Sequence, residues 1–330
     1  MIKKPEILIS QSLSPYENLA TEKYITSHLS AGECVLFLWR NADTIVIGRN
    51  QNCWRECRVS EFLESGGRIA RRLSGGGAVY HDVGNLNFSF IYPEGEFSTE
   101  QGLEIIANAC HAHGIEAEAS GRNDILTGGA KFSGNAFYSL TGESGVKGVC
   151  HHGCILISAD TGRLERFLNV SKKKLESKGV KSVRSRVVNL ESISEGLTAE
   201  SFAESLAAAF REKMGGRTEL YELTGDALDE IKKEAGHLAS DEWIFGRKLD
   251  FTDSFGARFS WGEIGFHFKV SAGVVTECRV FSDSMDPALP SILESAFTGH
   301  AFSAKELANA LMIEDITVKN DIIGLLYDSI

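Results

Sequence analysis

The sequence lacks any long apolar run: no stretch approaches the ~20 residues that a membrane-spanning helix needs. Its first residues, 1–6 (MIKKPE), lack the apolar region of a secretory signal. An excess of basic residues is lacking too, because 45 acidic residues outnumber 34 Lys and Arg and the net charge is −11. We therefore expect no membrane partner and no nucleic-acid partner, and any basic site must be local.

Internal repeats and low-complexity tracts are also absent, and the seven cysteines are scattered and odd in number. This pattern fits reduced thiols in a cytoplasmic protein better than a disulfide framework. The remaining composition is that of an ordinary globular protein, with 43% hydrophobic and 24% charged residues. The length of 330 residues suggests ~2 domains.

The most informative motif spans residues 71–82 (RRLSGGGAVYHD) and runs on through residues 84–87 (GNLN). Three glycines let a ligand approach the backbone, whose N–H groups can form an anion-binding concavity. The neighbouring Arg71 and Arg72 supply planar, charged forks that match phosphate oxygens. The segment therefore predicts a binding site for a phosphorylated or acyl-phosphate ligand.

Other interpretations of this motif fit less well. A flexible turn between strands would explain the three glycines but not the arginines beside them. No glycine is followed by Lys and then Ser or Thr, so the motif is not a Walker loop. Tyr80 occupies the place of the third glycine of a dinucleotide fingerprint, which excludes that motif as well.

The expected secondary structure is mixed in order. Residues 14–17 (SPYE) form a capping box with proline at the first helical position, so a helix should begin there. Alternation over residues 87–92 predicts a half-buried strand. Because strands and helices do not alternate regularly, we expect an α/β or α+β mixed sheet with antiparallel pairs. Further strands are predicted at residues 35–39 and 44–47, and further helices at residues 98–114 and 198–214.

The last part of the chain predicts a small α+β unit of its own. A boundary is expected near residues 240–248. Three strands and then three helices are expected beyond it, at residues 257–261, 265–270, 274–281, 287–296, 304–311 and 316–327.

A second motif surrounds Lys131. Residues 121–125 (GRNDI) are followed by residues 128–136 (GGAKFSGNA), so one lysine is enclosed by small residues. A lysine on a surface turn is usually just solvated, but here the glycines leave room for a ligand to reach the ammonium. A compact positive charge at an acyl–phosphate junction would stabilise the negative charge that develops there.

A third segment, residues 171–186, holds seven basic residues against one acidic residue, Glu176. It predicts either a solvated basic helix or a mobile lid that carries charge toward a polyphosphate. Aromatic residues do not interleave with the basic ones, so stacking on nucleic-acid bases is disfavoured.

A fourth segment, residues 150–154 (CHHGC), contains residue types that bind zinc, or that place a cysteine nucleophile beside a histidine. A strand follows it, and alternation along a strand puts His151 on the face opposite Cys150, His152 and Cys154. A four-ligand metal site from this segment alone is therefore geometrically poor. Cys53 and Cys57, one helical turn apart, are interpreted as ordinary helix residues.

Taken together, these motifs resemble lipoate–protein ligases. The matching segments appear in the family's order and spacing over residues 10–240, and the tail from Phe245 resembles the family's small accessory domain, with residues 258–262 (RFSWG) as its clearest mark. The matching segments are residues 71–82, 121–125, 131–136, 151–153 and 178–186.

The resemblance implies a biotin/lipoate ligase-like fold, related to class II synthetase cores, in a catalytic domain over residues 1–243. A small α+β accessory domain over residues 244–330 is implied beside it. The implied reaction has two steps: lipoate attacks the α-phosphate of ATP to give lipoyl-adenylate and pyrophosphate, and a carrier lysine then takes the lipoyl group as AMP leaves. Mg²⁺ is implied as a cofactor held through the nucleotide phosphates, not by protein ligands.

The implied partners are lipoyl carrier domains of 2-oxoacid dehydrogenase acyltransferase subunits and the glycine-cleavage H protein. Lys131 is the implied catalytic residue, contacting both the lipoyl carbonyl oxygen and the phosphate. The basic segment is expected to close over the adenylate and exclude water. One guanidinium and a stretch of backbone are expected to hold the nucleotide: Arg72, Gly77, Ala78, Val79 and Tyr80.

One residue departs from the family pattern: Cys154 stands where a threonine is expected after residues 151–153 (HHG). Relatives of the same fold include octanoyl and lipoyl transferases that use a cysteine thioester and no ATP, so a cysteine-dependent transferase is the alternative function. The basic segment and the accessory domain favour the ATP-dependent ligase. A polyanion-binding module that uses the basic segment alone is a lesser alternative.

Overall fold

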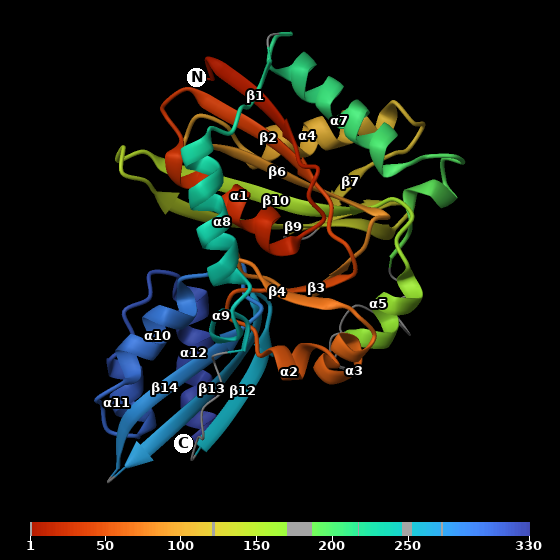
Figure 1. Cartoon of the computed structure of the whole chain (residues 1–330). Helices are drawn as coiled ribbons and strands as arrows, with labels where there is room; N and C mark the ends of the chain where they lie inside the picture. The colour runs from red at the N-terminus through yellow and green to blue at the C-terminus, as the bar shows by residue number, and fades with distance from the viewer. Residues whose placement is uncertain (1, 121–122, 170–186, 217, 246–252, 272) are drawn as a thin grey trace.

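The computed structural model describes the chain except for residues 1, 121–122, 170–186, 217, 246–252 and 272. The basic segment over residues 171–186 lies outside the described part. Figure 1 shows two structural units: a large one built on a broad sheet, and a smaller one near the C-terminus.

The broad sheet is mixed, as expected. Its described strands have the order β11-β1-β2-β6-β10-β9-β8-β7, in which β1 pairs in parallel with β11 and β2, and the other pairs are antiparallel. The strands are β1 (Lys4–Ile9), β2 (Glu33–Trp39), β6 (Asn85–Pro93), β7 (Glu118–Ser120), β8 (Asp124–Thr127), β9 (Ala130–Thr141), β10 (Lys147–Leu156) and β11 (Glu219–Leu220).

Helices cover both faces of this sheet (Figure 1). On one face lie α4 (Thr99–His111) and α7 (Ala199–Lys213); on the other lies α1 (Pro15–His28), with α8 (Gly225–Leu238) packed against it. The expectation of a half-buried strand over residues 87–92 is wrong. Helices cover the sheet on both faces, so β6 is buried along its whole length.

The main helices begin where the sequence predicts. The Ser14 side chain accepts a hydrogen bond from the N–H of Glu17, and Pro15 occupies the first position of α1. Capping boxes begin α4 and α7, formed by Ser98 with Gln101 and by Thr198 with Ser201. The predicted helices over residues 98–114 and 198–214 are therefore confirmed, with slightly shorter bounds.

A second sheet carries the glycine-rich motif. Its central strand β3 pairs with β4 in parallel and with β5 in antiparallel fashion. The core beneath it is organised around Phe62, whose ring lies 6.3 Å from that of Tyr80 and 4.9 Å from that of Phe167. The elements are β3 (Thr44–Ile47), β4 (Arg68–Arg71), β5 (Val79–His81), α2 (Cys53–Glu56), α3 (Val59–Glu64) and α5 (Thr161–Phe167). Residues 72–78, which join β4 to β5, are called the glycine-rich loop below.

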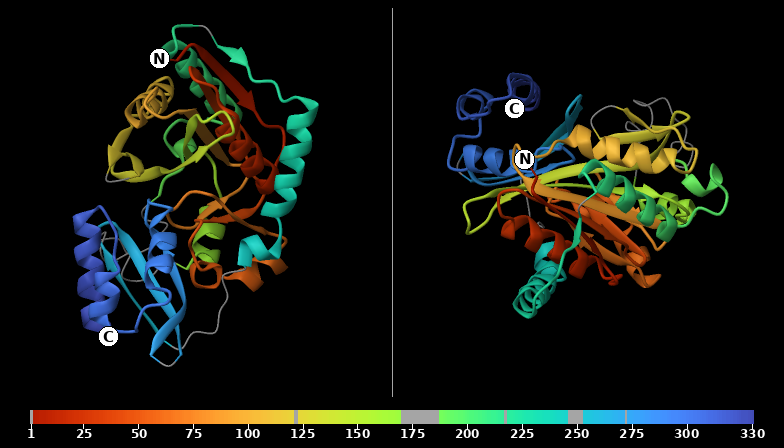
Figure 2. Two further views of the ribbon diagram at one scale, coloured as in Figure 1. Left: turned by 90° about the vertical axis from the view of Figure 1, so that its left-hand side faces the viewer. Right: turned by 90° about the horizontal axis from the view of Figure 1, so that it is seen from above.

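The C-terminal unit, residues 253–330, has a core of its own and is the small α+β unit expected from the sequence (Figure 2). The first predicted strand ends at Phe259, because the chain turns at Ser260 and Trp261 before Gly262. None of the described helices is both long and apolar enough to cross a bilayer. The unit comprises β12 (Asp253–Phe259), β13 (Gly262–Ser271), β14 (Val274–Ser282), α10 (Leu289–Phe297), α11 (Ala304–Asn309) and α12 (Ile316–Ser329). The connecting elements before it are a 3-10 turn, Leu190–Ser192, and α9 (Asp241–Phe245).

The C-terminal unit rests directly on the glycine-rich loop (Figure 2). The N–H of Gly76 donates to the carbonyl of Ser284 at 3.0 Å, and the N–H of Ser282 donates to the carbonyl of Asn50 at 3.1 Å. A Cβ atom at Gly75 would lie 2.2 Å from the carbonyl oxygen of Ser284, so this approach requires glycine. Glycine at this position serves contact between the two units.

The two faces of β10 differ in character, as the alternation predicts. His151 faces the α4 side, where its ring stacks on Phe137 at 4.5 Å and its Nε2 donates to Asn135 Oδ1 at 3.0 Å. Burial lowers the pKa of His151 to about 3. Cys150 and His152 face the α1 side. The histidine at position 151 is therefore a neutral core residue, not a metal ligand of its neighbours.

We expect Gly75→Ala to lower the free energy of unfolding by about 1–3 kcal/mol, because the new methyl group would force the Ser284 backbone away from the loop. Chemical denaturation monitored by fluorescence measures this change. The control is Gly236→Ala on the exposed face of α8, where a Cβ meets nothing within 4 Å; it should stabilise by about 0.5–1 kcal/mol. Equal effects from the two substitutions would contradict the inferred contact.

Acid should destabilise this protein partly through His151. The folded-state pKa lies below the unfolded value, so between pH ~3 and ~6.5 the unfolded state binds a proton that the folded state does not. Stability therefore falls as the pH drops through this window. His151→Phe should remove up to ~1.4 kcal/mol per pH unit from that slope, even if it weakens the fold at neutral pH. Denaturant midpoints between pH 4.5 and 7 measure the slope, and an unchanged slope would rule out this role.

Candidate active site

Two guanidinium groups are buried at the glycine-rich loop, and one of them, that of Arg72, shapes it. Arg72 donates through Nη2 to the carbonyls of Gly75 at 2.7 Å and Gly77 at 2.8 Å, and through Nη1 to the carbonyl of Val46 at 3.2 Å. The loop is thereby wrapped around this one side chain. Arg71 donates to backbone carbonyls after β3 and in α9, namely those of Gly48, Arg49, Gln51, Trp243 and Ile244.

In this structure the donors of both arginines are engaged by protein groups. Both side chains are buried, and burial lowers the pKa of Arg72 to about 10. Arg72 donates to carbonyls of the glycine-rich loop, which need partners because the loop is tight, and Arg71 donates to carbonyls outside it. A direct contact between Arg72 and a nucleotide stays a prediction; what the structure shows is that Arg72 sets the shape of the loop.

The accessible part of the motif is its end. Gly77, Ala78 and Val79 are half-buried, whereas the ring of Tyr80 packs into the core beside Phe62. Among the described strands, β5 pairs only with β3, so its other edge presents backbone N–H and C=O groups. Such an edge can bind a ligand through backbone alone, which is what the contacts expected at residues 77–80 require.

Lys131 lies in β9 and not on a solvated turn. Its ammonium forms an ion pair with Asp124 at 2.7 Å, and both side chains are largely buried. Gly134 provides the space, because a Cβ atom there would lie 2.7 Å from Lys131 Nζ. The carbonyl of Lys131 accepts the N–H of Val188 at 2.9 Å, so the chain passes beside this lysine directly after residues 170–186.

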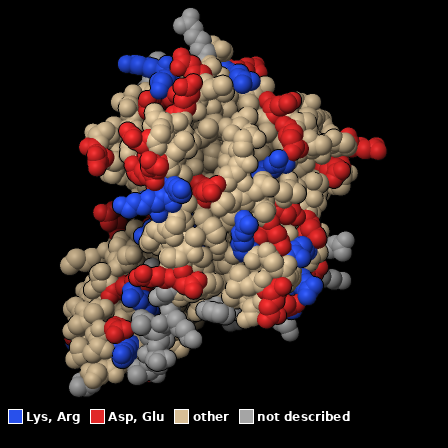
Figure 3. Space-filling view, in the orientation of Figure 1, with Lys and Arg blue, Asp and Glu red and all other residues tan. Residues whose placement is uncertain are grey.

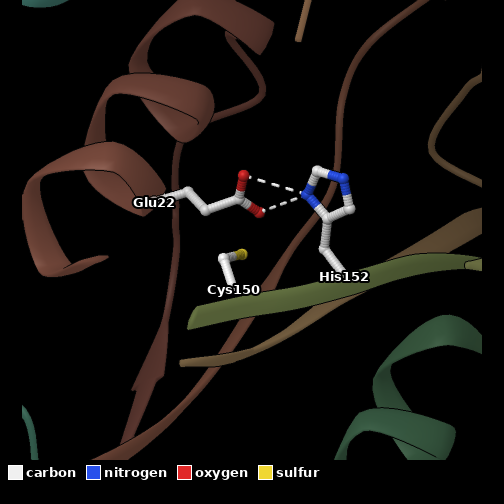
Figure 4. A group of neighbouring side chains, drawn as sticks. All are labelled: Glu22, Cys150 and His152. Atoms are coloured by element: carbon white, nitrogen blue, oxygen red, sulfur yellow. Dashed lines mark hydrogen bonds and ion pairs between the residues drawn. The ribbon is translucent and has the colours of Figure 1, made fainter. Parts of the chain in front are cut away.

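A chain of buried hydrogen bonds, called the relay below, connects the glycine-rich loop to the broad sheet and to α1. Arg72 Nε donates to Ser74 Oγ at 3.0 Å, and Ser74 Oγ lies 2.7 Å from His152 Nε2. His152 Nδ1 lies 2.9 Å from both oxygens of Glu22, as Figure 4 shows. A carboxylate only accepts, so Nδ1 carries a proton. Ser89 Oγ donates to the same carboxylate at 2.5 Å.

Glu22 is fully buried, with 0% of its surface exposed. Burial by itself would raise the pKa of this carboxyl, but the facing His152 ring and the hydrogen bonds it receives outweigh burial and hold the pKa below its ordinary value. Sequence reasoning missed this residue. The available signal was its spacing, since Glu22 lies three residues after Leu19 and three before Ile25 on the apolar face of α1.

The contact of Ser74 with His152 also places the loop on the same face of the sheet as Lys131. His152 and Cys154 point to the same face of β10, and Cys154 pairs with Gly134 on β9, over which the Lys131 ammonium lies. Two residues along a strand span ~7 Å, so the loop at Ser74 and the ammonium lie on one face of the sheet within reach of a single small ligand. The first two motifs of the sequence therefore meet in space.

Glu22, Cys150 and His152 are also a group of metal-ligating side chains, with ligand atoms within 4.8 Å of one another in the described part of the chain (Figure 4). Both nitrogens of His152 are already hydrogen-bonded. Burial raises the pKa of the Cys150 thiol well above its usual range, which keeps it protonated. The group is therefore satisfied as a hydrogen-bonded cluster, and its chemistry does not call for a metal.

Cys154 does not resemble an activated nucleophile. The thiol of Cys154 accepts a hydrogen bond from Asn85 Nδ2 at 3.0 Å, and burial raises its pKa to about 12. A catalytic thiolate requires the opposite shift. Cys53 and Cys57 are buried in and just after α2, with sulfur atoms 3.8 Å apart.

Charges of both signs are interspersed over the face of the molecule in Figure 3. The described residues on this face form no broad basic surface of the kind that a polyanion would need.

Comparison with known proteins identifies the family. Residues 14–211 match the family described as the lipoyl protein ligase A/B catalytic domain, and residues 248–326 match the bacterial lipoate protein ligase C-terminus. Lipoate-protein ligase A of Bdellovibrio bacteriovorus is 37% identical over 318 residues, covering 94% of this chain and 92% of that protein.

Solved structures agree with this assignment. P. falciparum LipL1, solved in complex with lipoate, superposes with a TM-score of 0.83 and 29% identity over 97% of this chain and 98% of that one. Lipoate-protein ligase A bound with ATP has the same fold, with a TM-score of 0.63 and 22% identity over 74% of this chain and 99% of that one. The expected mixed α/β fold with a C-terminal unit is confirmed, and this chain belongs to the lipoate–protein ligase family of enzymes.

Proposed function

We propose that this chain is an ATP-dependent lipoate–protein ligase that forms lipoyl-adenylate, releases pyrophosphate and transfers the lipoyl group to a carrier lysine. The observation that carries the proposal is the placement of Lys131: a largely buried ammonium, held by Asp124, on the same face of the sheet as the glycine-rich loop. An enzyme that joins an acid to a phosphate needs a positive charge at that junction.

In the first step a carboxylate oxygen of lipoate attacks the α-phosphorus of ATP, and the bond to pyrophosphate breaks. Lys131 stabilises the negative charge that develops on the phosphate and the acyl oxygen. Its ion pair with Asp124 orients the ammonium before the substrates arrive, so little reorganisation is needed. In the second step a carrier amine attacks the acyl carbon, AMP leaves, and the same ammonium faces the oxyanion of the intermediate.

The nucleotide is proposed to lie along the edge of β5 that faces away from β3, against the backbone of Gly77, Ala78, Val79 and Tyr80. Arg72 supports this edge by folding the loop that precedes it. Mg²⁺ is proposed to arrive bound to the nucleotide phosphates, with no dedicated protein ligand. Closure of residues 172–186 over the adenylate remains part of the proposal on the grounds of charge alone.

The proposed domains correspond to the two structural units. We propose residues 1–243 as the catalytic domain and residues 244–330 as the accessory domain, since the C-terminal core is separate and touches the loop from outside. The proposed carriers are lipoyl domains of 2-oxoacid dehydrogenase acyltransferase subunits and the glycine-cleavage H protein. A cytoplasmic location is proposed from the reduced, scattered cysteines.

The proposed reaction is tested by incubating the wild-type protein with ATP, Mg²⁺ and lipoate. We expect a bound lipoyl-adenylate by mass spectrometry and one pyrophosphate released per adenylate formed. Omitting ATP should abolish both acyl-adenylate formation and lipoylation of an added lipoyl domain. Transfer of an acyl group without ATP, blocked by thiol alkylation, would instead establish the cysteine-dependent transferase.

Lys131→Ala should abolish adenylate formation, with a loss of at least the ~10²–10³-fold typical of removing one electrostatic contact to a transition state. Pyrophosphate release measures the loss, and circular dichroism checks that the fold is intact. Lys147→Ala is the matched control, because this exposed lysine of β10 pairs only at the surface with Glu94. Wild-type pyrophosphate release by the Lys131→Ala protein would refute the assigned role.

A further inference from the structure

Cys53 and Cys57 form a pair of buried thiols that the proposed reaction does not use. Their sulfur atoms lie 3.8 Å apart, and only 2% and 1% of the two residues are exposed. The N–H of Cys57 donates to the carbonyl of Cys53 at 3.1 Å, so the two residues close one helical turn. Residues related in this way have Cα atoms about 6 Å apart, which is within the range that a disulfide spans.

The two thiols differ in how readily they ionise. The hydrogen bond with the Cys57 thiol lowers the pKa of Cys53, and the Arg71 guanidinium lowers it further, so that together they outweigh burial. The same hydrogen bond and burial raise the pKa of Cys57. A thiol that ionises readily therefore lies beside a second thiol, which is the arrangement found where cysteines are oxidised reversibly.

The chain just before Cys53 supports the glycine-rich loop. Arg71 Nη1 donates to the carbonyls of Arg49 at 2.9 Å and Gln51 at 2.7 Å. The N–H of Arg49 in turn donates to the carbonyl of Ser74 in the loop at 2.9 Å. Cys53 follows Gln51 by two residues, so a displacement of Cys53 disturbs both of these supports.

The chain at Cys57 is held by the end of α5. Cys57 forms an antiparallel β-bridge with Leu168, and the N–H of Arg58 donates to the carbonyl of Phe167 at 2.9 Å. Because backbone pairing fixes this end of the pair, a closer approach of the two sulfur atoms must move Cys53 instead.

We propose that Cys53 and Cys57 are an oxidation site, where hydrogen peroxide forms a reversible disulfide that displaces the supports of the glycine-rich loop and slows adenylate formation. The modification and the displacement are independent of the proposed function, and only the effect on adenylate formation rests on it. Disulfide formation brings the sulfur atoms from 3.8 Å to about 2 Å apart, and the single turn of α2 has to absorb this contraction.

The chemistry consumes one peroxide and two thiols. The Cys53 thiolate attacks one peroxide oxygen, the O–O bond breaks, and the other oxygen leaves as water with the proton that the thiol released, which gives a sulfenic acid. The Cys57 sulfur then attacks the sulfenic sulfur, the S–O bond breaks, and the hydroxyl group leaves as a second water with the Cys57 proton. The sulfur atoms lose two electrons and the peroxide gains them. Opening of α2, a helix of one turn, gives the peroxide access.

Peptide mapping detects the disulfide without any activity assay. Trypsin cleaves after arginine, so it releases Cys53 in residues 50–55 and Cys57 in residues 56–58. The whole chain is treated with hydrogen peroxide, its free thiols are alkylated, and it is digested without reductant. We expect the two peptides to be joined, and to separate when a reductant is added. Recovery of unlinked peptides, or of a link confined to a covalent dimer, would overturn the proposal.

Hydrogen–deuterium exchange measures the displacement of the loop. The backbone N–H groups of Arg49 and Arg72 donate to the carbonyls of Ser74 and Ile47. We expect both to exchange about 10-fold faster in the oxidised protein than in the reduced protein, because these bonds open more often. Equal exchange in the two forms would show that the disulfide leaves the loop undisturbed, contrary to the proposal.

Substitutions connect the disulfide to adenylate formation. Peroxide should slow pyrophosphate release by the wild-type protein about 10- to 100-fold, because a small misplacement at a reacting site is costly, and a reductant should restore it. Cys53→Ala and Cys57→Ala should each abolish the linked peptides, and Cys53→Ala should make pyrophosphate release insensitive to peroxide. Cys110→Ala is the matched control: burial raises the pKa of this thiol of α4 to about 12, so its loss should change neither result. Equal inhibition of the Cys53→Ala and wild-type proteins would refute the regulatory role.

The two levels of inference fail differently. If the wild-type protein makes no acyl-adenylate, the proposed function fails, while the linked peptides and the exchange rates still decide the oxidation site. If the wild-type protein makes the adenylate but forms no disulfide, or forms one with unchanged exchange and pyrophosphate release, only the oxidation switch fails.

Discussion

The structure of the site depends on a run of hydrogen bonds through the protein interior, from Arg72 through Ser74 and His152 to Glu22. A glycine-rich loop has no side chains with which to hold its own shape, so the shape must come from elsewhere. The guanidinium of Arg72 collects the loop's carbonyls, and Ser74 ties the loop to the broad sheet. The cost of burying a carboxylate is offset because Glu22 faces His152 and accepts a hydrogen bond from Ser89.

This constraint makes the site a meeting point of three pieces of structure. The second sheet supplies the loop and strand β5, the broad sheet supplies Lys131, and the C-terminal unit contacts the loop through Ser284. Each piece has its own core, so the geometry of the site depends on how the cores dock. The N–H of Gly76, which the sequence suggested for a ligand, is used in that docking.

Much of the fold could be predicted because local rules act over short distances. The cap at Ser14, the alternation in β10 and the apolar runs of β2 and β3 depend on neighbouring residues alone, and the structure confirms them. The burial of β6 could not be predicted, because alternation does not reveal whether a second layer covers the polar side. Glu22 was missed for a similar reason. An isolated acidic residue on a helix is normally predicted to be solvated, and its partner His152 lies 130 residues away in the sequence.

The sequence by itself determined the types of groups available, the spacing of the motifs and the family to which the chain belongs. Those properties depend on residue identity and short-range geometry, which folding does not alter. The tertiary structure alone decided what each group faces: the Arg71 and Arg72 side chains donate to backbone carbonyls, Ser74 contacts His152, and the Lys131 ammonium is paired with Asp124. Burial and the cost of unpaired polar groups set these outcomes, and both are properties of the packed chain as a whole.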